Sequence, residues 1–261
     1  MREHHQRTLD RLVDHFQGDP AFPALLLGGS IARGWDKEDS DVDVVLIATE
    51  AEYARRAPAR ALTYYTTEFC DYPGGYVDGK IVNLDFLHEV AECGSEPARA
   101  AFSGAIIGYS RLPGLEDLLR RIPVYPEAQR TSRLQSFYAQ VQALAWYVGE
   151  AERRGDRYLL QKMSADLVLF AGRLILAHNR ILFPYHKWLF TELARAPEKP
   201  EDMLALADQL LAAPSKLLAE QFSQCVLNFA EWEKPPEGWP ARFMQDTEWA
   251  WRRGCAPLAD L

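Results

Sequence analysis

The sequence predicts an α/β domain followed by an all-α helical bundle, and three observations support this prediction. Short apolar runs broken by glycine and turn residues fill the first half, for example at residues 25–27 and 44–47. Pro123 and Pro126 then favour a boundary. Beyond them, apolar residues recur at helical spacing without a convincing strand pattern. We therefore expect one domain over residues 1–122 and a second over residues 123–261.

Composition indicates a globular protein and argues against some classes of partner. The 261 residues are 48% hydrophobic, which is enough for a substantial core. A net charge of -8 argues against broad, sequence-independent binding to nucleic acid. The sequence shows no apolar signal core and no membrane-length run, and its four cysteines (Cys70, Cys93, Cys225 and Cys255) have no paired or metal-type spacing. We expect a cytoplasmic protein, either monomer or homodimer, without membrane association.

The first element is expected to be an amphipathic helix that packs on the rest of the domain. Its apolar positions, at helical spacing, are Leu9, Leu12, Val13 and Phe16. The Gly-Asp-Pro sequence that begins at residue 18 should end it. Three histidines, His4, His5 and His15, lie on or before this helix without a partner at metal-ligand spacing, so we expect them at the surface.

A glycine turn and two aspartates form the most informative stretch. The apolar run at residues 25–27 leads into Gly28, Gly29 and Ser30, a turn that lets backbone N–H groups approach a phosphate. The alternative is an ordinary turn in which Ser30 caps a short helix. Asp41 and Asp43 open the next apolar run and, two residues apart, should face the same way. Since a buried, unpaired carboxylate is costly, Asp43 favours a cation site, and paired carboxylates suit Mg²⁺.

Further along, residues 49–56 should form a short helix capped by Thr49. Residues 61–70 could form a strand. The Asp78-Gly79 pair between two apolar stretches is typical of a hairpin turn, whose second arm would run through residues 80–87. Asp85 is the one charged residue in the later part of that arm. It could be an edge-strand charge in water, or a third carboxylate that joins Asp41 and Asp43.

These residues resemble the signature of the DNA polymerase β-type nucleotidyltransferase superfamily: Gly29-Ser30, then Asp41-Val42-Asp43, then Asp85 on a later strand. The resemblance implies a mixed-sheet core and transfer of a nucleoside monophosphate with release of pyrophosphate. Asp41, Asp43 and Asp85 would be the catalytic, metal-binding residues for two Mg²⁺ ions, with Asp85 a candidate general base. Gly28, Gly29, Ser30 and Arg33 would bind the nucleoside triphosphate.

In the second half, helical periodicity covers residues 127–154, 157–180 and 203–232, with a short final helix near residues 247–253. Basic and aromatic residues cluster around Pro184, and among them Lys187 is a candidate triphosphate contact; the alternative is a solvated lysine beside Trp188. Four tryptophans are expected in the core or an interface, namely Trp146, Trp232, Trp249 and Trp251. This half resembles the helical domain of aminoglycoside and lincosamide nucleotidyltransferases.

The resemblance implies a metal-dependent nucleotidyltransferase, an antibiotic resistance-like enzyme that transfers AMP from ATP to a hydroxyl of an aminoglycoside- or lincosamide-like small molecule. One alternative is an antitoxin-type minimal nucleotidyltransferase that modifies protein or RNA, although such chains are usually short. The other is a catalytically silent nucleotide-binding module, which would not need three converging carboxylates.

Overall fold

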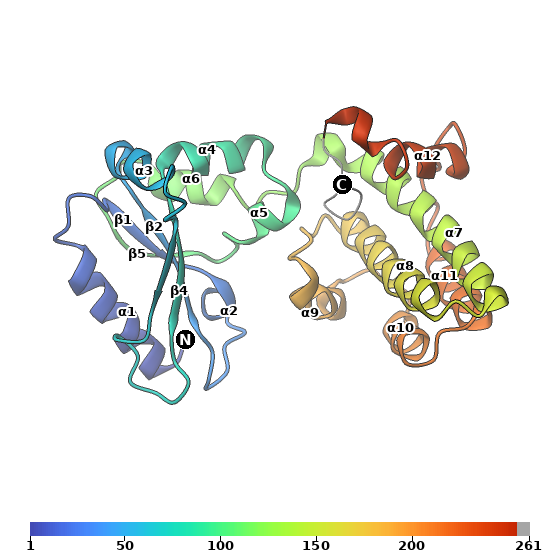
Figure 1. Ribbon diagram of the computed structural model, residues 1–261, viewed down its shortest axis with the longest axis horizontal. Coiled ribbons are helices and arrows are strands. Elements are labelled where there is room, and N and C mark those ends of the chain that lie inside the picture. Colours follow the sequence, from blue (N-terminus) through green and yellow to red (C-terminus); the bar gives the residue numbers. More distant parts are fainter. Residues whose placement is uncertain (255–261) are drawn as a thin grey trace. The chain divides into compact units, whose positions relative to one another are not determined.

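The computed structural model describes residues 1–254 and divides the chain into two units, one from Met1 to Val124 and one from Tyr125 onward. The first unit combines a sheet with helices, and the described part of the second is helical (Figure 1). This confirms the expected α/β core and helical bundle. Within residues 1–254, every helix is too short or too polar to cross a lipid bilayer. Cys255 lies outside the described residues.

A five-stranded mixed sheet organises the first unit. Its order is β3-β4-β2-β1-β5. The central pair β2 and β4 is parallel, and the other neighbours are antiparallel. The register sets Asp43 beside Asp78 and Ile47 beside Val82. The strands are β1 (Ala24–Leu27), β2 (Val42–Ile47), β3 (Thr63–Thr66), β4 (Val77–Val82) and β5 (Ile106–Ser110).

Helices cover the two faces of this sheet differently. On one face, Leu12 and Phe16 of α1 pack with Leu25 and Val44. On the other, side chains of α4 and α6 pack at the end marked by Ile47 and Val82. The helices of this unit are α1 (Glu3–Phe16), α2 (Gly29–Ala32), α3 (Glu50–Arg56), α4 (Leu84–Cys93), α5 (Glu96–Ala100) and α6 (Leu115–Arg121). The opening helix and the Thr49-capped helix are thus confirmed.

The predicted hairpin at Asp78-Gly79 is wrong. Strand β4 runs straight through this pair, and its antiparallel partner is β3. Gly79 is needed inside the strand, because a Cβ there would lie 2.7 Å from Val44 Cγ2. The strand also ends at Val82, earlier than expected. The Asn83 side chain accepts a hydrogen bond from the Phe86 N–H at 3.0 Å and caps α4, and this cap converts the next residues from strand to helix.

His5 is buried, which corrects the expectation that all three N-terminal histidines are at the surface. Its side chain is 0% exposed. His5 Nε2 lies 3.1 Å from His4 Nε2, and His5 Nδ1 lies 3.4 Å from Asp36 Oδ2. The Tyr72 ring packs edge-on against the His5 ring. Because Asp36 belongs to the segment between α2 and β2, this cluster holds that segment against α1.

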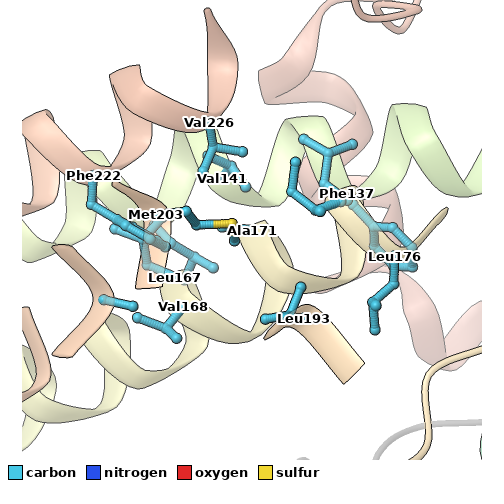
Figure 2. Close-up of a cluster of buried hydrophobic side chains, with 14 of the residues drawn as sticks. Phe137, Val141, Leu167, Val168, Ala171, Leu176, Leu193, Met203, Phe222 and Val226 are labelled. Carbon is cyan, nitrogen blue, oxygen red and sulfur yellow. The ribbon is translucent and has the colours of Figure 1, made fainter. Parts of the chain in front are cut away.

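The second unit is built around two long helices, α7 and α8, which a two-residue turn joins. Its hydrophobic core includes Phe222 and Met203 (Figure 2). The expected helix over residues 203–232 is two helices, separated at Pro214, which cannot continue a helical hydrogen-bond pattern. Trp232 lies in this core as expected, whereas Trp146, Trp249 and Trp251 are exposed. The elements are η1 (Glu127–Gln129), α7 (Arg130–Arg154), α8 (Arg157–His178), η2 (His186–Trp188), α9 (Leu189–Arg195), α10 (Met203–Ala212), α11 (Lys216–Leu227), α12 (Trp239–Asp246) and η3 (Ala250–Arg253).

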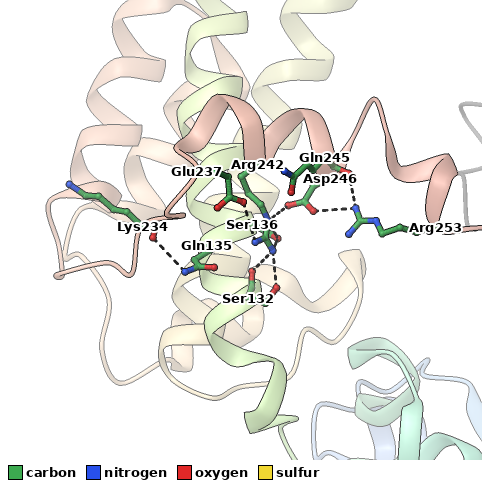
Figure 3. A network of polar contacts seen from close by, with 9 residues as sticks. All are labelled: Ser132, Gln135, Ser136, Lys234, Glu237, Arg242, Gln245, Asp246 and Arg253. Carbon is green, nitrogen blue, oxygen red and sulfur yellow. Dashed lines mark hydrogen bonds and ion pairs between the residues drawn. The ribbon is translucent and has the colours of Figure 1, made fainter.

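Arg242 attaches α12 to α7 through a polar network (Figure 3). Its guanidinium donates hydrogen bonds to the Ser136 hydroxyl at 2.7 Å and to the Ser132 carbonyl at 2.9 Å. It also pairs with Asp246 at 2.8 Å, and Asp246 in turn accepts from Arg253. The final part of the described chain is therefore anchored by charge-assisted hydrogen bonds as well as by apolar packing.

Candidate active site

The glycine turn after β1 lies directly against Asp43. The Gly28 N–H donates to the Asp43 carbonyl at 2.8 Å. Gly29 has φ +63°, in the left-handed region, and a Cβ on it would fall 1.7 Å from Asp43 Oδ2. Position 29 therefore requires glycine for two reasons, its backbone conformation and the room that the Asp43 carboxylate occupies. The glycine turn and the aspartate, which the sequence predicts to belong to one site, are therefore in direct contact through Gly29 and Asp43.

Three carboxylates gather at the end of the sheet where β2 and β4 begin. Asp43 and Asp78 are register partners on neighbouring parallel strands, so their side chains leave the sheet on the same face. Asp41 lies just before β2, where the Val42 N–H bonds to the Tyr76 carbonyl at 3.0 Å. The pKa of the Tyr76 hydroxyl is raised, chiefly by the charge of Asp41, then by burial and a hydrogen bond to Asp41, and further by Asp78 and Asp43.

Asp85 does not join this group, and its prediction as a converging third carboxylate on a strand is wrong. It is an exposed residue in the first turn of α4. Since β2 and β4 are parallel, α4 follows the far end of the pair, at Ile47 and Val82. Ile47 comes four positions after Asp43, a span of about 13 Å along the strand. An acidic residue at that place favours the helix N-terminus electrostatically instead.

The other expected nucleotide-binding residues have different surroundings. Ser30 is 7% exposed and starts the short helix α2 with Gly29. Arg33 donates a hydrogen bond to the Ala100 carbonyl, and its guanidinium lies 4.9 Å from the centre of the Trp35 ring. In the helical unit, Lys187 is exposed and its ammonium lies 5.3 Å from the Trp188 ring centre. Its position in a short helix beside an aromatic ring is compatible with either interpretation given above.

The donor set at the sheet end fits a hard divalent cation that is shared with a ligand. Within residues 1–254, no three carboxylate, imidazole or thiol groups are arranged to hold a metal ion by themselves. Asp43 and Asp78 are nonetheless register partners on neighbouring strands, and Asp41 comes two residues before Asp43. Mg²⁺ is commonly bound by one or two carboxylates together with substrate phosphates. Asp41 and Asp43 meet that requirement, and the remaining ligands would come from a phosphate and water.

Sequence reasoning missed Asp78 and its strand neighbour Lys80. Both are exposed, and because they are two residues apart they share the face that carries Asp43. Among the described residues, Lys80 has no ion-pair partner. The signal was the alternation of Val77, Gly79 and Ile81 with Asp78 and Lys80, a period of two that indicates a half-exposed strand. The Asp-Gly turn signal obscured this alternation.

Comparisons with known proteins found a similarity to a solved structure but no matching protein family. No protein-family model matches the chain, and no curated protein matches it. Among solved structures, the chain is similar to a nucleotidyltransferase-like protein from Exiguobacterium sibiricum, with a TM-score of 0.47 and 13% sequence identity. That similarity covers 95% of this chain and 79% of the other.

Proposed function

We propose that this protein is a metal-dependent nucleotidyltransferase that moves a nucleoside monophosphate from a nucleoside triphosphate to a hydroxyl group and releases pyrophosphate. The observation that carries the proposal is the contact between the Gly28-Gly29 turn and Asp43, beside Asp41 and Asp78, at the end of the sheet where β2 and β4 begin. The Gly28 N–H is used by the Asp43 carbonyl, so the N–H groups of Gly29 and Ser30, in the first turn of α2, would bind the phosphate beside the carboxylates. Phosphoryl-type transfer needs this combination, since its catalysis rests on positioning and charge neutralisation.

The residues at this end of the sheet divide between phosphate binding, metal binding and proton transfer. The turn after Gly28 would bind the β- and γ-phosphates through the N–H groups of Gly29 and Ser30, and Asp41 and Asp43 would hold Mg²⁺, two ions in the full complex. Bound there, the metal would neutralise charge on the attacking and leaving oxygens. Asp78, rather than Asp85, is the third carboxylate and accepts the proton of the attacking hydroxyl. Lys80, on the same face, contacts the leaving pyrophosphate. A bound cation would offset the like charges that Asp43 and Asp78 place side by side on neighbouring strands.

The finer identity of the substrates follows from the resemblance of the sequence. We propose ATP as the donor, with an aminoglycoside- or lincosamide-like molecule as the acceptor. The net charge of -8 suits an acceptor with several positive charges.

A turnover assay tests this proposal. The protein is incubated with Mg²⁺, each of the four nucleoside triphosphates and a panel of aminoglycosides and lincosamides, and pyrophosphate release is followed with Asp41→Asn as the blank. Release that depends on one acceptor and is lost in Asp41→Asn is the expected result. Release that is equal in the blank would contradict the assignment of the carboxylates. Metal-dependent triphosphate binding without release would retain the nucleotide site and reject the small-molecule acceptor.

A further inference from the structure

A groove in the helical unit is unexplained by the proposed transfer reaction. Its volume is about 1200 Å³, and it lies between α7, α11 and the segment at residues 228–234. Ligand sites generally have volumes of several hundred to about 1,000 Å³, so this groove is large enough for a molecule of one or more rings. All its lining residues belong to the helical unit, so its description is independent of the site on the sheet.

Two helical stripes form its walls. On α7 the lining residues include Gln142, Trp146 and Gly149, and on α11 they include Lys216, Glu220 and Gln224. Spacings of three and four residues place each set on one face of its helix. At one end the Glu152 carboxylate accepts a hydrogen bond from the Lys216 backbone N–H at 3.1 Å. Gly149 allows this approach, because a Cβ there would already lie 3.3 Å from the Lys216 side chain.

Internal pairing uses only some of the polar groups in the groove. Arg153 pairs with Glu150 at 2.6 Å, and Lys216 lies 3.7 Å from Glu220. By contrast, the side chains of Gln224, Asn228 and Glu231 make no hydrogen bond or ion pair with any residue in the range 1–254. They offer hydrogen-bond donors and acceptors on the wall of a cavity.

Trp146 supplies an aromatic surface beside these groups. It is 56% exposed although it lies on the helix that forms much of the core, and the ring of its neighbour Tyr147 lies 4.9 Å away. An exposed indole is a large apolar surface that packing of this unit does not use. The groove therefore presents an exposed indole, that of Trp146, together with side chains that have no hydrogen-bond partner within residues 1–254, those of Gln224, Asn228 and Glu231.

We propose that this groove is a binding site for a saccharide, a polyhydroxylated ring that is neutral or carries a single amine. The apolar C–H face of a pyranose packs on the Trp146 indole, while its hydroxyls bond to Gln224, Asn228 and Glu231. Nucleotides and other phosphates are disfavoured, because four glutamates line the groove against three basic residues, two of which are already paired. A wholly apolar ligand would leave the polar wall unsatisfied.

Saturation-transfer NMR on the full chain tests this site with methyl glycosides of glucose, galactose, mannose, glucosamine and N-acetylglucosamine, without nucleotide or metal. We expect saturation transfer to the ring protons of at least one glycoside, with a dissociation constant that rises at least tenfold in Trp146→Ala and in Gln224→Ala. The matched control is Trp251→Ala, which removes an indole that is 65% exposed on η3 and does not line the groove. Its binding should equal that of the wild type.

The outcomes separate clearly. Absence of transfer to every glycoside would overturn the proposal, as would transfer that both groove variants leave unchanged. Circular dichroism and thermal unfolding of each variant confirm that any loss is local, since Trp146 and Gln224 are not core residues. The result is distinguishable from the transfer reaction, because Asp41→Asn should abolish pyrophosphate release and leave glycoside binding unaltered.

Discussion

Substitution of Gly29 by alanine tests the contact on which the proposed site depends. The added Cβ would lie 1.7 Å from Asp43 Oδ2, whereas real Cβ contacts are not shorter than 3.0 Å, so the carboxylate must move by about 1.3 Å or more. The left-handed backbone adds about 1–2 kcal/mol of strain, and a side chain forced off its rotamer adds about 0.5–1.5 kcal/mol. We expect the free energy of unfolding to fall by about 2–3 kcal/mol.

Gly34→Ala is the matched control. Gly34 has φ +70° in the same connection but has no atom within 4 Å of an added Cβ. It should therefore show only the backbone strain, about 1–2 kcal/mol, in urea unfolding. A displacement of about 1 Å in a catalytic group can lower a rate about 10²-fold, so Gly29→Ala should lose nucleotide turnover on that scale while Gly34→Ala retains it. Equal stability and equal turnover in the two variants would refute the role of the contact.

Three further predictions address the third carboxylate, the buried histidine and the core. Asp78→Asn should lower turnover at least about 10²-fold and Asp85→Asn less than about twofold, measured by pyrophosphate release; the reverse order would restore the sequence-based assignment. Burial and the nearby His4 lower the pKa of His5 despite Asp36, so the unfolded chain binds this proton more readily. The stabilising effect of neutral, buried His5 is complete above the ordinary imidazole pKa of about 6.5 and is lost as pH falls through the lower pKa of the folded state. In urea unfolding, the free energy of unfolding of a His5→Asn variant should therefore decline less steeply between pH 7 and pH 5 than that of the wild type. Phe222→Ala should cost about 3–5 kcal/mol, and Leu217→Ala, on the exposed side of the same helix, less than about 0.5 kcal/mol; similar values would contradict the packing shown in Figure 2.

Helices and the central strand were predictable because each carries a long or strongly biased local pattern. The apolar spacing of the opening helix and the Thr49 cap are complete within a few residues of sequence. The glycine turn and Asp43 were also paired correctly, because two antiparallel neighbours close in sequence bring their ends together. Local pattern and tertiary contact agree in these cases.

The third carboxylate could not be found in this way. Its position depends on which strands pair and in what direction, and the parallel pairing of β2 with β4 is a long-range contact. The Asp-Gly pair has strong turn propensity, but packing of Gly79 against Val44 overrides it. The burial of His5 likewise depends on Asp36, more than thirty residues away in sequence. In the cases of Asp78 and His5 a local signal was outweighed by a distant partner, whereas the Asn83 cap and the break at Pro214 are local signals that were missed.

The proposed function requires that a nucleoside triphosphate binds with Mg²⁺ at Asp41 and Asp43, and isothermal titration calorimetry measures this binding. ATP and then each other triphosphate are titrated into the full chain with Mg²⁺ and with EDTA, using the wild type, Asp43→Asn and, as a control, Asp85→Asn. We expect binding that needs Mg²⁺, is lost in Asp43→Asn and persists in Asp85→Asn. Binding of equal strength in Asp43→Asn, or no binding of any triphosphate to the wild type, would contradict this expectation.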